Sequence, residues 1–220
     1  MAGFSAMKVA IGDPFKAGSL ASKARQRRWQ MFEERFPDIA DMRVLDLGGF
    51  VKFWREMPKR PGELVIMNLD VQDTAHLQED WARVVTGDAC APPASVANDR
   101  FDLVFSNSLI EHVGGHLKRQ ELADVVEELA PHHWVQTPYR YFPVEAHYLF
   151  PGFQFLPVRA RAALAHRWAF SAWRSAPSEA VHDVLWVEFL SQTEMQYYFP
   201  KSEILQEKFC GLTKSIIAWK

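Results

Sequence analysis

The feature that most constrains the fold of this chain is a series of five short apolar runs, each followed directly by Gly, Asp, Asn or Pro. The runs are Met42–Leu47, Leu64–Leu69, Arg83–Thr86, Phe101–Ser106 and Trp134–Thr137. Helical patterns occur between them, and the clearest, Leu117–Leu129, places its Leu and Val residues on one face. Apolar strands that alternate with amphipathic helices are typical of a parallel sheet covered on both faces. The sequence therefore predicts an α/β, doubly wound fold.

Two further strand patterns close the chain, Glu203–Phe209 and Lys214–Trp219, after a helix that ends near Phe199. Only the link CGLT separates them, and a parallel connection needs a dozen or more residues. We therefore expect these two strands to be antiparallel neighbours, which brings the sheet to seven strands. A helical segment within residues 1–40 precedes the sheet and carries Trp29 and Phe32, which we expect to be packing anchors.

The composition of the chain disfavours several classes of protein function. The chain has 220 residues, a net charge of −2 and 48% hydrophobic residues. The near-neutral net charge disfavours a nucleic-acid-binding protein. No apolar run is long enough to span a bilayer. A chain of this length can form one substantial hydrophobic core. The only cysteines, Cys90 and Cys210, lie far apart, which disfavours a disulfide framework or a thiolate zinc site. We expect one domain, residues 1–220, in the cytoplasm.

Aromatic residues concentrate after the fifth predicted strand. Of the 29 aromatic residues, 16 lie between Trp134 and Phe199, including all five tyrosines. This concentration indicates either an apolar wall around a ligand or the core of a helical subdomain, and a substrate cap inserted at residues 138–192 would need both. Three arginines in or near the segment could pair with a carboxylate or phosphate of a ligand: Arg140, Arg159 and Arg161.

Polar and small residues follow the predicted strands where a ligand is expected. In a doubly wound sheet the ligand lies beyond the carboxyl ends of the strands. The residues found there are Asp46, Gly48 and Gly49 at the end of the first strand, Asp70 after the second, Asp88 after the third and Asn107 after the fourth. Glycines let the backbone turn sharply beside a ligand. Asp70, 24 residues after Asp46, has the position of a carboxylate that binds ribose hydroxyls.

The motifs VLDLGG (44–49), LD (69–70), GDA (87–89), FDLVFSNSLIEHV (101–113) and GLTKSIIA (211–218) together resemble the ordered motifs of class I S-adenosylmethionine-dependent methyltransferases. The resemblance runs from about residue 42 to the end of the chain. It implies a Rossmann-like sheet whose last strand is antiparallel. It also implies that S-adenosylmethionine is the cofactor, with Asp46 and Gly48 at its methionine part, Asp70 at the ribose, Asp88 and Ala89 at the adenine, and Asn107 at the entrance to the reaction centre.

The chain departs from this family in its glycine loop. The family's usual pattern is D-x-G-x-G-x-G. In this chain, Phe50 and Lys52 stand at the last two glycine positions of that pattern. A nicotinamide dinucleotide-binding fold is the competing interpretation, but it requires G-x-G-x-x-G at this point, and that pattern is absent.

The segment after the fourth strand limits the methyl acceptor. Enzymes of the resembled family that methylate base nitrogens or glutamine amides typically carry Asn/Asp-Pro-Pro-aromatic there, whereas this chain has Ser106-Asn107-Ser108-Leu109. We therefore expect a hydroxyl acceptor, whose proton a base can take.

The candidate bases are His147, with Glu145 close enough to orient its ring, and His112. Each histidine has a structural alternative, since His147 can simply pack within a Pro-rich loop. His112 and His116 have the spacing of two metal ligands on a helix, but Gly114 and Gly115 between them favour a turn, so we expect no metal.

The resulting hypothesis is an S-adenosylmethionine-dependent methyltransferase acting on oxygen of a small, amphiphilic or lipid-linked acceptor such as a sugar, a glycolipid or a natural product. The alternative is a non-catalytic cofactor-binding or scaffold protein that retains the fold.

Overall fold

The computed structural model describes residues 20–70, 79–168 and 175–220, with no account of side chains before Gln26. The described chain divides into two compact units. The sheet unit comprises residues 38–142 and 185–220, and the second unit comprises residues 20–37 and 143–184.

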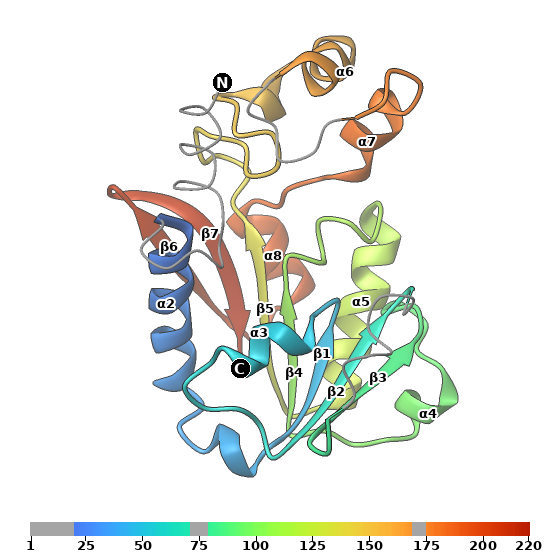
Figure 1. Cartoon of the computed structure of the whole chain (residues 1–220), viewed down its shortest axis with the longest axis vertical. Helices are drawn as coiled ribbons and strands as arrows, with labels where there is room; N and C mark the ends of the chain where they lie inside the picture. The colour runs from blue at the N-terminus through green and yellow to red at the C-terminus, as the bar shows by residue number, and fades with distance from the viewer. Residues whose placement is uncertain (1–19, 71–78, 169–174) are drawn as a thin grey trace. The chain divides into compact units, whose positions relative to one another are not determined.

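The sheet unit is built on seven strands in the order β3-β2-β1-β4-β5-β7-β6 (Figure 1). The strands are β1 Arg43–Leu47, β2 Glu63–Asn68, β3 Ala82–Thr86, β4 Leu103–Asn107, β5 His132–Pro138, β6 Glu203–Phe209 and β7 Leu212–Trp219. The first five are parallel, and β7 is antiparallel to both β5 and β6. The predicted α/β sheet and its antiparallel last strand are therefore confirmed.

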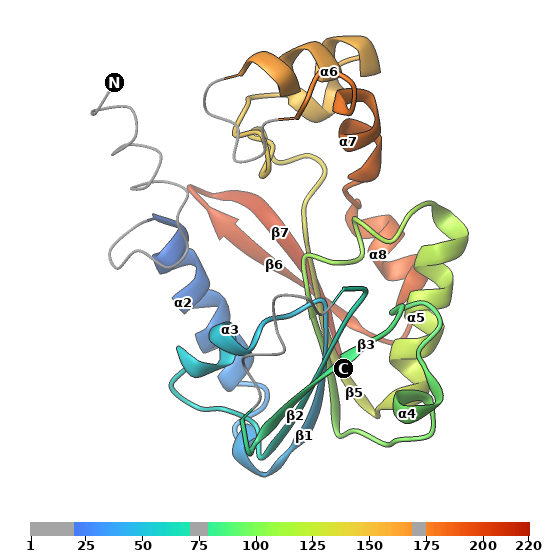
Figure 2. The same cartoon turned by 45° about the vertical axis from the view of Figure 1, so that its right-hand side comes forward.

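Helices cover both faces of this sheet. Figure 2 shows α3 (Val51–Arg55) on one face and α4 (Ala94–Ala97), α5 (His116–Leu129) and α8 (Gln192–Tyr198) on the other. Because side chains alternate along a strand, Leu45 and Leu47 pack with the α5 and α8 side, in one core with Val126. Burying each such side chain contributes about 1.5–3 kcal/mol. Asp46, between the two leucines, points to the α3 side.

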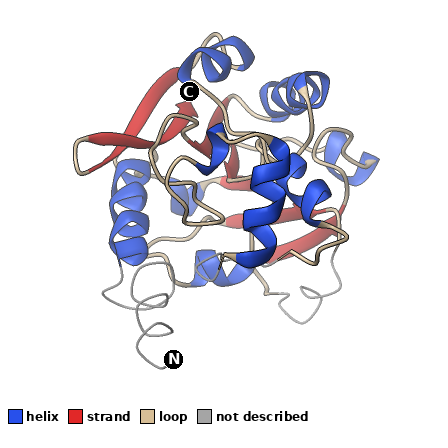
Figure 3. Ribbon diagram, turned by 90° about the horizontal axis from the view of Figure 1, so that it is seen from above, coloured by secondary structure: helices blue, strands red, loops and turns tan. Residues whose placement is uncertain are grey.

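The hairpin of β6 and β7 is the antiparallel end of the sheet (Figure 3). Its ladder runs from the pair Glu203 and Trp219 to the pair Phe209 and Leu212, so β7 begins two residues before the predicted start. Strand pairing sets this boundary, because Leu212 and Thr213 pair with Phe209 and Lys208 across the hairpin although Leu212 is exposed. On the other side β7 pairs with β5, for example Gln136 with Ile217.

The second unit has its own aromatic core. It contains α2 (Leu20–Glu33), α6 (Val158–Arg167) and most of α7 (Ala180–Trp186). The rings of Tyr148 and Phe153 stack at 4.2 Å, and Phe150 meets Trp168 edge-on at 5.0 Å. On α2, Trp29 and Phe32 are buried and their ring centroids lie 4.8 Å apart, as expected of packing anchors. Among the described residues, no helix is long and apolar enough to cross a membrane.

Candidate functional site

The carboxyl ends of β1 and β4 bring two groups of predicted site residues together. The two strands are neighbours, with Leu47 paired to Ser106, so Gly48 and Asn107 leave the sheet side by side. The ends of β2 and β3 lie along the same edge, since all these strands are parallel. The sheet unit therefore gathers the predicted cofactor residues at one edge, as the doubly wound topology requires.

Asp46 is the buried acidic group of this edge. Its side chain is 1% exposed, and the indole Nε1 of Trp54, on α3, donates a 2.7 Å hydrogen bond to its Oδ2. Its other oxygen, Oδ1, is buried and has no hydrogen-bond partner among the described residues. Burial raises the pKa of Asp46 to about 7, although the hydrogen bond from Trp54 opposes the shift. This oxygen can accept a hydrogen bond from a neutral or cationic donor.

The turn after β1 needs both of its glycines. Gly48 has a φ of +80°, a conformation that side chains disfavour, and its N–H donates to the carbonyl of Met67 at 2.9 Å. A Cβ on Gly49 would lie 1.7 Å from Oδ2 of Asp46, so the carboxylate occupies the space that any side chain would need. Asn68, at the end of β2, donates to the Gly49 carbonyl at 3.0 Å and fixes the turn.

The two departures from the family's glycine loop have a structural explanation. Phe50 is the N-cap of α3 with extended backbone, φ −135°, and Lys52 already lies in the helix. Neither conformation requires glycine. The phenyl ring of Phe50 is 59% exposed at the rim of this turn. The loop ends at Phe50, because α3 begins directly after it.

The acidic residues after β2 and β3 stand in different surroundings. Asp70 is exposed, two residues beyond the end of β2. Asp88 is half-buried and its Oδ1 accepts a 2.8 Å hydrogen bond from the backbone N–H of Cys90. This bond fixes the turn that carries Ala89, which is 9% exposed.

The turn after β4 contains a strained residue. Ser108 directly follows Asn107 and has a φ of +59°, which is uncommon for a residue with a side chain. Its N–H donates to the carbonyl of Gln136 at 2.9 Å, which holds the turn against β5. Such strain is found preferentially at functional sites. His112 lies in this segment, half-buried, with its N–H bonded to the carbonyl of Leu109 at 2.7 Å.

His147 and Glu145 form a dyad in the second unit. Nδ1 of His147 lies 2.8 Å from Oε1 of Glu145, whose side chain is 3% exposed. The other oxygen of Glu145 accepts from the backbone N–H of Tyr148 at 2.5 Å, and Leu149, with a φ of +52°, closes the turn. An ionised carboxylate accepts the Nδ1 proton, which places the lone pair of the imidazole on Nε2. The distance between Glu145 and His147 thus suits the predicted role of Glu145 in orienting the imidazole ring. The dyad belongs to the second unit, whereas the predicted cofactor residues belong to the sheet unit.

Two of the three arginines considered for ligand binding have partners within their own units. Arg140 donates to Oε1 of Glu194 and to the carbonyl of Phe189, both at 2.8 Å. Arg161 donates to the carbonyl of Val184 at 3.1 Å. Arg140 thus joins the segment after β5 to α8, and Arg161 joins α6 to α7. Among residues 20–70, 79–168 and 175–220, no group of three or more His, Cys, Asp or Glu side chains is arranged to hold a metal ion.

Sequence reasoning missed two buried groups at the sheet edge. Trp54 appears in the sequence only as part of a short helix, and nothing in the pattern connects it to Asp46. Glu111 is fully buried and accepts a 2.9 Å hydrogen bond from Oγ1 of Thr137 at the end of β5. The neighbouring histidine drew attention to this segment, but a buried carboxylate cannot be recognised from the sequence.

No family model and no curated protein matches the sequence. Solved structures do match the fold. The CurJ carbon methyltransferase superposes with a TM-score of 0.58 and 10% identity, over 98% of this chain and 57% of that one. The methyltransferase domain of bacterial CtHen1-CN gives a TM-score of 0.53 and 11% identity, over 89% and 98%. Magnesium protoporphyrin IX methyltransferase (ChlM) from Synechocystis PCC 6803, with bound SAH, gives 0.53 and 8%, over 99% and 92%.

At these identities the likeness concerns the fold. The strand order with β7 inserted antiparallel also differs from the order 3-2-1-4-5-6 of the dinucleotide-binding fold. The chain has the fold of class I S-adenosylmethionine-dependent methyltransferases.

Proposed function

We propose that this protein is an S-adenosylmethionine-dependent methyltransferase that methylates a hydroxyl of a small or amphiphilic acceptor. The observation that carries the proposal is Asp46, a buried carboxylate with one unpartnered oxygen, at the glycine turn where this fold binds its cofactor. Leaving a buried charge without a partner is costly. The α-ammonium group of S-adenosylmethionine is a cation of the kind that Asp46 lacks, so the residues present fit this cofactor.

The other cofactor roles follow from positions along the same edge. Asp70 would accept from the ribose hydroxyls, Asp88 and Ala89 would contact the adenine, and Asn107 would border the reaction centre. Gly48 and Gly49 would let the backbone turn sharply beside the ligand, and the missing side chain of Gly49 leaves room for the Asp46 carboxylate. When bound, S-adenosylmethionine supplies an electrophilic methyl group carried on a sulfonium.

The choice of a hydroxyl acceptor depends on the dyad. A hydroxyl becomes a better nucleophile as its proton is removed, and His147 can accept that proton at Nε2 because Glu145 holds Nδ1 protonated. The absence of the Asn/Asp-Pro-Pro-aromatic turn after β4 agrees with this choice. His112, in the sheet unit, is the second candidate for the base. Residues 138–192 are the proposed acceptor cap of a single methyltransferase domain.

A second candidate function is a cofactor-binding or scaffold protein without activity. The observation that favours it is the glycine loop, in which Phe50 and Lys52 replace two of the family's glycines.

A methyl-transfer screen separates the two functions. The protein is incubated with S-adenosylmethionine labelled in its methyl group and a metabolite extract, and labelled products are identified by mass spectrometry and NMR. The proposal expects an O-methylated product that is not formed when the protein is omitted. Binding of the cofactor without any labelled product would favour the non-catalytic function, and a labelled N- or C-methyl product would contradict the choice of oxygen.

A further inference from the structure

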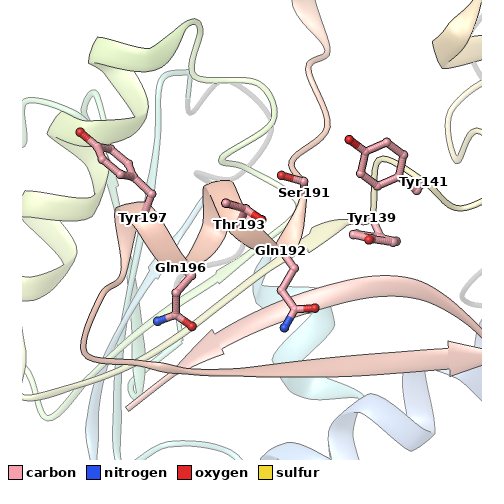
Figure 4. A pocket seen from close by; sticks show the side chains of 7 residues that line it. All are labelled: Tyr139, Tyr141, Ser191, Gln192, Thr193, Gln196 and Tyr197. Carbon is pink, nitrogen blue, oxygen red and sulfur yellow. The ribbon is translucent and has the colours of Figure 1, made fainter.

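A hollow of about 650 Å³ lies on the sheet unit, where the segment after β5 passes the start of α8 (Figure 4). We call it the Tyr–Gln hollow. Its lining residues are Tyr139, Tyr141, Ser191, Gln192, Thr193, Gln196 and Tyr197. This volume is in the range of small-molecule sites, about 300–1,000 Å³. None of these residues belongs to the proposed cofactor site, so the hollow requires its own explanation.

The lining of the hollow is neutral. None of the seven residues carries a charge. The charged neighbours in the sequence, Arg140 and Glu194, form an ion pair at 2.8 Å. Glu194 also accepts from the N–H and hydroxyl of Ser191, which completes a capping box at the start of α8. A ligand of the hollow is therefore selected by shape and hydrogen bonds rather than by charge.

Two tyrosine rings form one end of the hollow, as Figure 4 shows. Tyr139 and Tyr141 meet edge-on with ring centroids 5.5 Å apart. Tyr139 is anchored, because its N–H donates to the carbonyl of Lys214 at 3.0 Å and its ring packs on the core. Tyr141 is 56% exposed. An exposed ring held in place by a second ring offers a flat surface at little cost in conformational entropy, and its face attracts the polarised C–H groups of a sugar ring.

Two glutamines add a donor and an acceptor. Gln192 and Gln196 lie one helical turn apart and extend from the same side of α8 (Figure 4). Nε2 of Gln196 lies 3.2–3.3 Å from three carbonyl oxygens, which leaves Oε1 as the acceptor. Oε1 of Gln192 accepts from Gln206 at 3.0 Å, which leaves Nε2 as the donor.

We propose that the Tyr–Gln hollow binds a neutral sugar ring. A pyranose combines an apolar C–H face, which suits Tyr141, with neighbouring hydroxyls that both donate and accept, which suits Gln192 and Gln196. An apolar ring would offer no partner to Oε1 of Gln196 or to Nε2 of Gln192, and a charged ligand would find no counter-charge in the lining.

The hollow also lies near the proposed reaction centre. Gln136 pairs with Asn107 across β4 and β5, and Tyr139 is three residues further along the chain. Three extended residues span about 10 Å. The assignment of the bound sugar to the methyl acceptor rests on the proposed function, whereas sugar binding itself does not.

Saturation-transfer NMR on the full chain tests the inference, with maltose, cellobiose, lactose and sucrose as probes. We expect saturation transfer to the ring protons of at least one disaccharide, and none to cyclohexanol or glucose 6-phosphate at the same concentration. Tyr141→Ala and Gln192→Leu should each weaken the binding at least fivefold. The matched controls are Phe155→Ala and Gln30→Leu, which change an exposed aromatic ring and an exposed amide in the second unit.

The inference is overturned if no disaccharide shows saturation transfer, if cyclohexanol binds as well as the sugars, or if both hollow variants bind like the controls. Circular dichroism of each variant verifies that it is folded. Calorimetry with S-adenosylhomocysteine on the same samples keeps the two proposals apart. Cofactor binding without sugar binding contradicts only the hollow, and sugar binding without cofactor binding contradicts only the methyltransferase.

Discussion

The indole nitrogen of Trp54 donates a 2.7 Å hydrogen bond to Oδ2 of Asp46, and both side chains are buried beside the glycine turn. Trp54 also packs edge-on against Phe105 of β4, with ring centroids 5.0 Å apart. One aromatic residue of α3 thus holds the carboxylate in place and joins the helix to the sheet. It leaves the second carboxylate oxygen for another partner.

Replacing Trp54 by Phe should destabilise the protein while retaining most of the ring packing. The variant removes the hydrogen bond from the indole Nε1 to the buried carboxylate of Asp46, and hydrogen bonds to charged groups are worth about 1.5–3 kcal/mol. We expect a decrease of that size in the free energy of unfolding, measured by urea denaturation at pH 8. The control Trp186→Phe changes a ring that is 48% exposed and should stay within about 0.5 kcal/mol of the wild type.

Titration of Asp46 should lower the free energy of unfolding as the pH rises. Its pKa is raised from 3.8 to about 7 by burial, so between these values the folded chain binds more protons than the unfolded chain. The stabilisation is complete below about pH 4 and is lost as the pH rises through 7, with a total near 4 kcal/mol. Urea denaturation of the wild type and of Asp46→Asn should therefore give a difference in unfolding free energy that changes between pH 4.5 and 7.5.

The comparison with Asp46→Asn is needed because His133 acts in the opposite direction. Burial lowers the pKa of His133 from 6.5 to about 4, so its contribution is present above pH 6.5 and is lost as the pH falls through 4. His133 is the same in both proteins and cancels in the difference. A difference that is constant over this pH range would show that Asp46 does not titrate as stated.

Gly49→Ala should disturb the cofactor site more than an ordinary loop substitution. The added Cβ would lie 1.7 Å from Oδ2 of Asp46, so either the turn or the carboxylate must move. We expect S-adenosylhomocysteine to bind at least tenfold more weakly, measured by calorimetry. The control is Gly115→Ala, because a Cβ there meets no atom within 4 Å. Equal affinities of the two variants would remove the Gly49 turn from the site.

Glu145→Gln tests the dyad without removing the imidazole. The carboxylate accepts from His147 at one oxygen and from the N–H of Tyr148 at the other, whereas an amide has an oxygen at only one of these two positions. With an acceptor found by the methyl-transfer screen, we expect kcat to fall about 10- to 100-fold, and about 10²- to 10⁴-fold for His147→Ala. KM and the affinity for S-adenosylhomocysteine should not change. The exposed His182 of α7 supplies the control His182→Ala.

Wild-type turnover of His147→Ala would exclude His147 as the base. His112→Ala would then be the next variant, because His112 is the other candidate. Loss of turnover together with loss of cofactor binding, in either variant, would indicate a structural role instead.

The sheet could be predicted from the sequence because its first five strands are short apolar runs, each followed directly by Gly, Asp, Asn or Pro. β6 matches its predicted range, Glu203–Phe209, whereas β5 begins at His132, two residues early. That extension depends on hydrogen bonds between His133 and Lys220, which lie far apart in the sequence and leave no periodic pattern. The positions of the cofactor candidates followed from the ends of the strands.

The contacts of the site could not be predicted in the same way. The bond between Trp54 and Asp46, the buried Glu111 and the Tyr–Gln hollow all depend on how side chains meet after the chain has folded. The hollow joins residues after β5 to a helix some fifty positions later. Composition indicated an aromatic segment there, but only the packing shows which rings are buried and which are exposed.

The most direct test of the central claim is isothermal titration calorimetry of S-adenosylhomocysteine with the wild-type chain and with Asp70→Ala, a substitution at an exposed position. We expect saturable binding at one site per chain in the wild type, and affinity about 10- to 100-fold weaker in the variant, from the loss of about 1.5–3 kcal/mol. Unchanged affinity in Asp70→Ala would remove Asp70 from the ribose site. No binding by the wild type at high micromolar concentration, in a sample shown to be folded, would contradict the claim that this protein is a methyltransferase.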